Sequence, residues 1–404
     1  MSEHLFDNAG RTKLALVTYG VTLPDGLPQP SHWLSQSNTM ETVIDMRLPT
    51  GHWVSVPVGQ PYHQESDLSL HVSKTRAWLV CEQRELDVEL IRSPSFYSQR
   101  TRTGARMGSF SSLHDRVLVL QPLMGCGFFS GEKKACQYCV FDSMLNEATP
   151  PLRNHLDLVE VVLEALKERD LDTVYLYNAY TPGDDVGLGR LLPIISLIRR
   201  HIGHRQIALE TVAPKDLAVI DELYAAGLDI FICNMEIYDE SCFANVCPGK
   251  HQLGGHQVIM AALRHALSIF RHGAVVSNLI IGLEPVESTC VGIETLVGEG
   301  VVPLLVPFRP LPNTSLMQHH VPNLETVEQA FLHLYRCLLL SKLPTYRLRD
   351  MGRVFTPMES RVLIGGTVTL DQHLAKIVTS EVGRKLYGWI DKLRRQLRVR
   401  YEDD

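Results

Sequence analysis

Three cysteines in the second quarter of the chain have the types and spacing of a metal-binding loop. Cys126, Cys136 and Cys139 follow an apolar, β-branched run and stand in the segment Cys-Gly-Phe-Phe-Ser-Gly-Glu-Lys-Lys-Ala-Cys-Gln-Tyr-Cys. Thiolates are soft ligands that suit iron–sulfur clusters and zinc. Zinc sites usually combine two close ligand pairs, so zinc would need His114 or a distant cysteine here. Three thiolates on a four-iron cube would leave one iron open to a small molecule.

This segment resembles the cysteine loop of the radical S-adenosylmethionine (SAM) superfamily. Tyr138 has the place of the aromatic residue that precedes the last cysteine in that family. The commonest family spacing is Cys-x3-Cys-x2-Cys, whereas the Cys-x9-Cys-x2-Cys spacing here resembles the Elongator catalytic subunit and, in its length, biotin-synthase-related proteins. The resemblance implies a [4Fe–4S] cluster whose open iron binds SAM, and whose electron cleaves SAM to a 5′-deoxyadenosyl radical.

Further signatures follow the later strands, and the same resemblance implies SAM contacts there. Residues 178–185 resemble the Gly-Gly-Glu loop that takes the SAM amino group, and residues 247–250 resemble the segment whose basic residue meets the SAM carboxylate. Residues 277–284 resemble the segment that clasps adenine. With Tyr138, the expected cofactor contacts are Asn178, Thr181, Gly183, Glu210, Glu236, Lys250, Ile280, Gly282 and Arg309. For Glu210 and Arg309, SAM and substrate both remain open as the bound group.

Short β-branched runs alternate with longer stretches of helical periodicity through the middle of the chain. This alternation predicts βα units, and the motifs described above follow the predicted strands. Strands are expected at 116–121, 173–178, 206–212, 229–234, 274–281 and 301–308. Helices are expected at 156–169, 189–201, 215–226, 255–271 and 288–298. Such a pattern predicts either a doubly wound sheet or a barrel. Since each polar signature follows a strand, where barrel active sites are built, we favour an α/β fold with a partial (β/α)6 TIM-like barrel.

The rhythm divides the chain into three expected regions. Residues 1–113 form a β-rich accessory region, with strands expected at 52–58 and 69–76. Residues 114–320 form the radical SAM core barrel. The rest, 321–404, is a mainly helical extension with helices at 324–341 and 371–398 and a β-like stretch at 362–370.

The composition is that of an ordinary globular protein, with 404 residues, 45% of them hydrophobic and 21% charged. The net charge is −6, so a nucleic-acid partner is not expected. Neither a signal peptide nor a bilayer-spanning run is found, and the nine cysteines are irregularly spread. We therefore expect a cytoplasmic protein without a membrane partner.

The sequence predicts a radical SAM enzyme that abstracts hydrogen from a small or medium metabolite, supplied with electrons by a donor such as flavodoxin or ferredoxin. Two alternatives remain: an Elongator-like tRNA-modifying enzyme and a non-catalytic, zinc-stabilised binding module. Cys233, Cys242 and Cys247 form either an auxiliary cluster or a set of buried apolar side chains. No residue is assigned to substrate chemistry.

Overall fold

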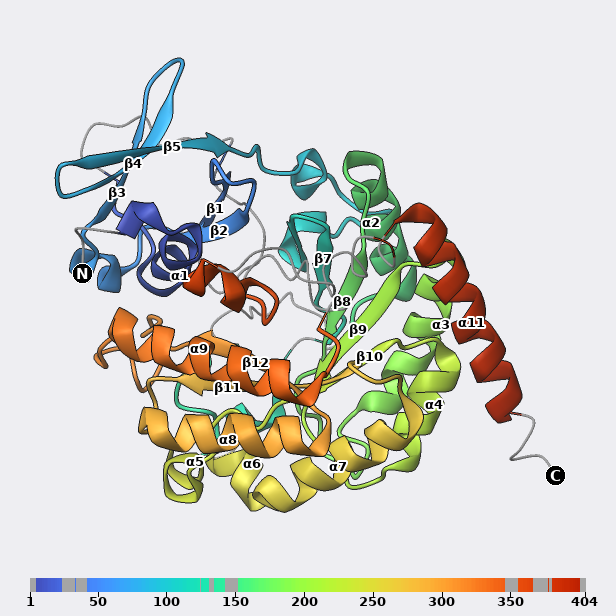
Figure 1. The fold of residues 1–404 in the computed structure, drawn as a ribbon. Coiled ribbons are helices and arrows are strands. Elements are labelled where there is room, and N and C mark those ends of the chain that lie inside the picture. Colours follow the sequence, from blue (N-terminus) through green and yellow to red (C-terminus); the bar gives the residue numbers. More distant parts are fainter. Residues whose placement is uncertain are drawn as a thin grey trace.

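The described residues form two β-sheets, each built from strands that are consecutive in sequence (Figure 1). The computed structural model describes residues 5–23, 33, 42–123, 125–130, 134–141, 152–345, 355–365, 377 and 380–399. The N-terminal sheet is antiparallel, in the order β2-β1-β5-β4-β3. Its strands are β1 (Val43–Arg47), β2 (Trp53–Pro57), β3 (Leu68–Val72), β4 (Ala77–Cys81) and β5 (Arg84–Leu90).

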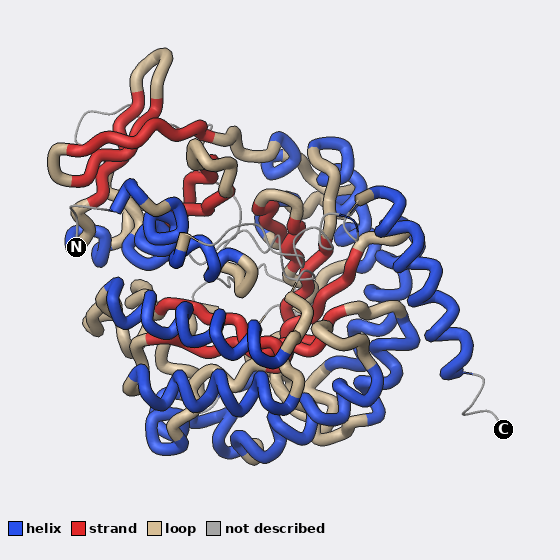
Figure 2. Tube along the Cα trace, viewed as in Figure 1, coloured by secondary structure: helices blue, strands red, loops and turns tan. Residues whose placement is uncertain are grey.

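The larger sheet has seven strands in the order β12-β11-β10-β9-β8-β7-β6. Strands β7 to β12 are parallel, and β6 pairs antiparallel with β7 at one edge. Its strands are β6 (Ser111–His114), β7 (Val117–Leu120), β8 (Thr173–Tyr177), β9 (Gln206–Thr211), β10 (Ile230–Cys233), β11 (Val275–Ile281) and β12 (Val302–Pro307). This sheet curls inside a layer of helices, which defines an α/β fold (Figure 2).

Helices cross between the successive parallel strands and cover the outer face of this sheet (Figure 1). Their bounds are α2 (His155–Glu168), α3 (Leu192–Ile202), α4 (Ala218–Ala226), α5 (Glu240–Val246), α6 (Pro248–Gln252), α7 (Gly255–Ile269) and α8 (Val286–Glu299). The Asn154 side chain caps α2 by accepting a hydrogen bond from the Leu156 N–H at 2.9 Å. Leu158, Val161 and Val162 are fully buried, as the helical period predicts.

Each of the six strands expected in the core is present, and α9 (Leu324–Ser341) has the bounds expected for it. The helix expected from residue 215 begins later, at Ala218. The reason is local: the backbone N–H groups of Lys215 and Asp216 donate to the Asp184 carbonyl at 2.8 and 3.1 Å. This holds the segment against the loop after β8.

One expectation for the terminal regions is corrected by the structure. The β-like stretch at 362–370 is wrong in its described part, because η9 (Glu359–Ile364) is a 3-10 helix; residues 366–370 lie outside the described residues. The expected helix at 371–398 is present as α11 (Glu381–Val399); residues 371–376, 378 and 379 of this expectation lie outside the described residues. The boundary placed at residue 113 falls inside β6, which joins β7 through a tight turn where Asp115 has a φ of 49°.

The described N-terminal helix, α1 (Ala9–Tyr19), packs against η9 and α9. The Lys13 ammonium lies 2.5 Å from a Glu359 carboxylate oxygen, and the Asn8 amide donates to the Leu363 carbonyl at 2.9 Å. Segments more than 300 residues apart are thus joined beside the larger sheet. None of the described helices is both long and apolar enough to span a lipid bilayer.

Candidate functional site

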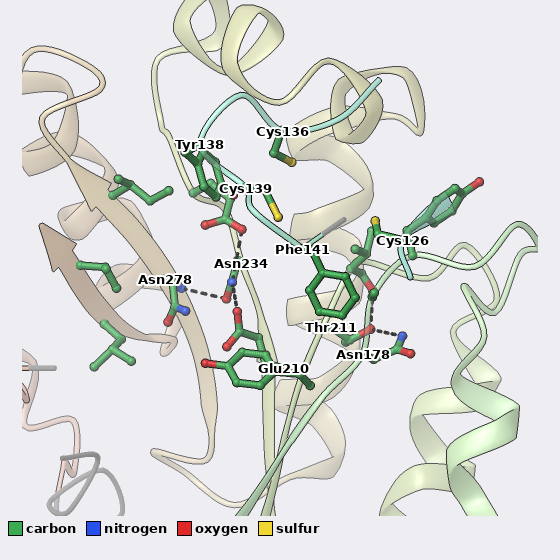
Figure 3. Close-up of a pocket in the computed structure, with 18 of the residues that line it drawn as sticks. Cys126, Cys136, Tyr138, Cys139, Phe141, Asn178, Glu210, Thr211, Asn234 and Asn278 are labelled. Atoms are coloured by element: carbon green, nitrogen blue, oxygen red, sulfur yellow. Dashed lines mark hydrogen bonds between the residues drawn. The ribbon is translucent and has the colours of Figure 1, made fainter. Parts of the chain in front are cut away.

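A cavity of about 320 Å³ extends from the interior of the curled sheet to the carboxyl ends of its parallel strands (Figure 3). Ligand sites of α/β folds are built at this end, where loops from separate strands meet. The cavity brings together ten of the expected site residues: Cys126, Cys136, Tyr138, Cys139, Asn178, Glu210, Glu236, Lys250, Ile280 and Arg309.

The cysteine loop follows β7 and is held by its neighbours on two sides. The Gly127 N–H donates to the Tyr180 carbonyl at 2.7 Å, and the rings of Phe128 and Tyr180 stack with centroids 4.1 Å apart. On the other side, the Gly249 N–H donates to the Lys134 carbonyl at 3.0 Å. A Cβ at Gly249 would lie 2.4 Å from that oxygen, so only glycine allows this approach. Loops after two other strands therefore fix where the thiols lie.

The three thiols differ in how readily they ionise. A hydrogen bond from the Cys247 thiol lowers the pKa of Cys136, and the same contact raises the pKa of Cys247 well above its usual range. Burial raises the pKa of Cys126, and it raises that of Cys139 to about 12. Cys136 is therefore the thiol that this environment keeps most readily as a thiolate.

A continuous polar network crosses the cavity wall below the cysteines. The Tyr175 hydroxyl donates to Glu210 at 2.5 Å, and the Asn234 amide donates to Glu210 at 2.6 Å and to Glu236 at 3.3 Å. The Lys250 ammonium then lies 2.5 Å from Glu236. Side chains from β8, β9, the end of β10 and α6 thus form one connected set of charges and hydrogen bonds.

The charges of this network are set by burial and by pairing. Burial is the main cause that raises the pKa of Glu210, although its hydrogen bonds from Tyr175 and Asn234 oppose the rise. For Lys250, burial alone would lower the pKa, but the Glu236 carboxylate raises it well above its usual range. Lys250 therefore stays a cation beside the thiols, with its charge already shared with Glu236.

Glu236 has a backbone conformation that is uncommon for a residue with a side chain, with a φ of 64°. Its N–H donates to the Asn278 carbonyl at 2.8 Å, and its carbonyl accepts from the Ile280 N–H at 2.7 Å. These bonds to β11 hold the carboxylate on the cavity wall.

The Asn178 side chain presents an unused acceptor in a fixed orientation. Its amide nitrogen donates to the Val186 carbonyl at 3.2 Å and to the Thr211 hydroxyl at 3.0 Å, which fixes the amide orientation. Its buried oxygen has no hydrogen-bond partner among the described residues. Buried acceptors are nearly always satisfied, so this oxygen fits a ligand that donates, such as an ammonium group.

Thiolates are the usual protein ligands of iron–sulfur clusters, and three cysteines contribute to this cavity. Within the described ranges, no group of three or more His, Cys, Asp or Glu side chains surrounds one metal-ion position. In a four-iron cluster each cysteine binds a different iron, so its thiols are spaced around the cube instead of converging on a point. The three cysteines line the same cavity (Figure 3).

Three expected contacts do not line the cavity. Thr181 packs under Gly187, and the Gly183 carbonyl accepts from the Val186 N–H at 3.2 Å within a turn. Gly282 has a φ of 103° and packs on Pro322, where a Cβ would lie 2.9 Å away. These residues shape the loops rather than the cavity surface.

Several lining residues were not assigned to the site from the sequence. They are the ring and amide side chains of Phe141, Tyr175, Tyr177, Tyr180, Asn234, Asn278 and Phe308, with His114 at the β6 edge. The alternation in β8 places Tyr175 and Tyr177 on one face, which could have indicated them. His114, considered above as a zinc ligand, directs its Nδ1 to the Ser55 hydroxyl at 3.0 Å.

Comparisons with known proteins give distant similarities. No family model matches the chain. It is 25% identical over 118 residues to bacteriochlorophyllide c C-7(1)-hydroxylase of Chlorobaculum limnaeum, a match that spans 29% of each protein. Among solved structures, methylornithine synthase (PylB) has a TM-score of 0.45 at 15% identity, covering 61% of this chain and 72% of that one. Yersinia pestis dihydropteroate synthase has a TM-score of 0.30 at 13% identity, covering 70% and 95%.

Proposed function

We propose that this chain is a radical SAM enzyme, built on a partial (β/α)6 barrel, that removes hydrogen from a small or medium metabolite. Cys126, Cys136 and Cys139 would hold a [4Fe–4S] cluster, and SAM would lie beside it in the cavity. The observation that carries the proposal is that three thiols line the same cavity as Asn178, whose side-chain oxygen has no hydrogen-bond partner among the described residues. The distant similarity to a hydroxylase supports the assignment to the radical SAM superfamily, without indicating the substrate.

When bound, the cluster and SAM supply a 5′-deoxyadenosyl radical that abstracts hydrogen from the substrate. The chain's own residues would bind and orient SAM and the substrate and shield them from water. The Asn178 oxygen would accept from the SAM ammonium, and Lys250 would provide positive charge near the SAM carboxylate while it remains paired with Glu236. The position of Ile280 on β11 suits an apolar contact to adenine.

The cavity also supports a small organic substrate. Its volume of about 320 Å³ lies within the range of small-molecule sites, and many of its lining side chains are aromatic or aliphatic. Polar groups that could orient a substrate are few and come from separate strands, mainly Glu210, Asn234 and Asn278. The Asn278 oxygen is buried and has no partner within the described part of the chain, so it can accept one hydrogen bond from a substrate.

The test is anaerobic reconstitution with iron, sulfide and a reductant, followed by assays for bound iron, bound sulfide and 5′-deoxyadenosine. Cys126→Ser, Cys136→Ser and Cys139→Ser should each lose the cluster and the nucleoside product together. Cys290→Ser is the matched control, because Cys290 is half-buried on α8 and does not line the cavity. Zinc without iron or sulfide in the wild-type protein would overturn the proposal.

A further inference from the structure

Helix α11 (Glu381–Val399) exposes its apolar side chains instead of burying them. Five large apolar residues recur at helical spacing: Val382, Leu386, Trp389, Leu393 and Leu397, and each is between 41% and 77% exposed. At about 100° per residue they fall on one side of the helix, and we call this set the α11 stripe. A helix of a globular protein normally turns such a stripe toward the core.

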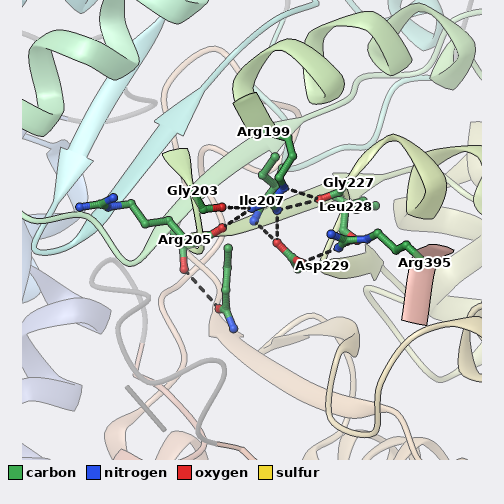
Figure 4. Close-up of polar contacts among 10 residues, drawn as sticks. Arg199, Gly203, Arg205, Ile207, Gly227, Leu228, Asp229 and Arg395 are labelled. Atoms are coloured by element: carbon green, nitrogen blue, oxygen red, sulfur yellow. Dashed lines mark hydrogen bonds and ion pairs between the residues drawn. The ribbon is translucent and has the colours of Figure 1, made fainter. Parts of the chain in front are cut away.

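The opposite face of α11 is the one that contacts the rest of the chain. Arg395 donates to Asp229 at 2.6 Å and to the Leu228 carbonyl at 2.9 Å (Figure 4). Its guanidinium lies over the Tyr224 ring. Gly388 packs on His204, where a Cβ would lie 2.2 Å from the imidazole. The helix is therefore attached through a polar face and a glycine, which leaves the α11 stripe directed away from the barrel.

Basic residues border the α11 stripe on both sides. Lys392 and Arg394 are exposed and lie about 100° to either side of the centre of the stripe. Residues 381–399 contain six basic residues and two acidic ones, whereas the whole chain has a net charge of −6. This helix therefore has a net positive charge in a chain that is acidic as a whole. An apolar stripe with basic borders complements a layer of anionic headgroups above acyl chains.

A second copy of this chain fits the α11 stripe less well. Like charges beside an apolar seam disfavour helix pairing, and the charged side chains described at the borders, Lys385, Lys392 and Arg394, are all positive. Trp389 at the middle of the stripe is typical of side chains that settle at a membrane interface.

We propose that α11 is an interfacial helix that seats the protein on an anionic lipid surface, with the α11 stripe among the acyl chains. Such a helix needs no bilayer-spanning segment, so this proposal departs from the expectation that the chain has no membrane partner. It rests on α11 alone and is independent of the proposed cluster chemistry.

The experiment is flotation of the full-length protein with vesicles of phosphatidylcholine and phosphatidylglycerol, and with vesicles of phosphatidylcholine alone. Wild type should float with the anionic vesicles, more weakly at high salt. Leu386→Ser/Leu393→Ser should lower the apparent partition coefficient by at least about tenfold. Lys392→Gln/Arg394→Gln should lower it by about fivefold for each residue replaced. Leu340→Ser is the control, since Leu340 on α9 is 85% exposed outside the α11 stripe.

Three results would overturn the proposal. The first is wild-type protein that stays unbound with anionic vesicles at low salt. The second is binding unchanged in the double leucine variant while circular dichroism shows its fold intact. The third is a concentration-dependent dimer, without flotation, that the same variant dissociates, which would assign the stripe to a second copy. A blue shift of wild-type tryptophan fluorescence on adding vesicles, lost in Trp389→Phe, would support insertion independently of flotation.

Discussion

The buried carboxylate of Asp229 joins three parts of the chain, and replacing it should destabilise the protein by an amount that burial determines. Asp229 pairs with Arg199 on α3 and with Arg395 on α11, and it accepts from the Ile207 N–H on β9 at 2.8 Å (Figure 4). Its side chain is 9% exposed. Asp229→Asn keeps the shape but removes the charge between two guanidinium groups. Disrupting a buried pair through one partner costs about 3 kcal/mol or more.

Asp170 provides a matched control. It also pairs with two arginines, Arg116 at 2.7 Å and Arg205 at 2.9 Å, but its side chain is 46% exposed. Asp170→Asn should therefore cost less than about 1 kcal/mol, as exposed ion pairs do. Urea denaturation of wild type and both variants, followed by circular dichroism, measures the two free energies of unfolding. Equal losses would refute the argument that burial rather than the number of ion pairs sets the cost.

The loss for Asp229→Asn should also depend on pH. Burial opposes ionisation of Asp229, but Arg199 and Arg395 outweigh it and lower the pKa below its ordinary value. A lowered pKa in the folded state contributes stability above the unfolded value, and this contribution is lost as the pH falls through the folded value. The difference between wild type and Asp229→Asn should thus be full at neutral pH and shrink below about pH 4. A difference that grew on acidification would contradict this sign.

Two further predictions concern the candidate site. Gly249→Ala would place a Cβ 2.4 Å from the Lys134 carbonyl oxygen and displace the cysteine loop, so the protein should bind less iron after reconstitution. Gly298→Ala is the control: no atom lies within 4 Å of the Cβ that it adds, so this variant should bind as much iron as wild type. Lys250→Met leaves Glu236 buried without its cation, so the unfolding free energy should fall by about 3 kcal/mol and recover in part in Lys250→Met/Glu236→Gln. A double variant less stable than the single one, measured by urea denaturation, would show that the pair is not coupled in this way.

The sequence alone determined the elements and the thiols. Short β-branched runs and helical periods are local patterns, so they located the six core strands and the bounds of α9. The Cys-x9-Cys-x2-Cys spacing is also local, and it indicated a metal-binding loop after β7. The sequence indicated the turns less clearly. The hairpin at Asp115 depends on the positive φ of that one residue, and the later start of α4 depends on hydrogen bonds to the Asp184 carbonyl, about 30 residues earlier.

Only the tertiary structure decided which groups became partners. The contact of Cys136 with Cys247 joins loops after different strands, and that of Lys250 with Glu236 joins residues on either side of α5; no local pattern encodes such distances. The same holds for α11. Its period predicts an amphipathic helix, but a period does not say which face meets the core. The site for Arg395 is created by Asp229 and Tyr224, more than 160 residues earlier, and that attachment leaves the α11 stripe exposed.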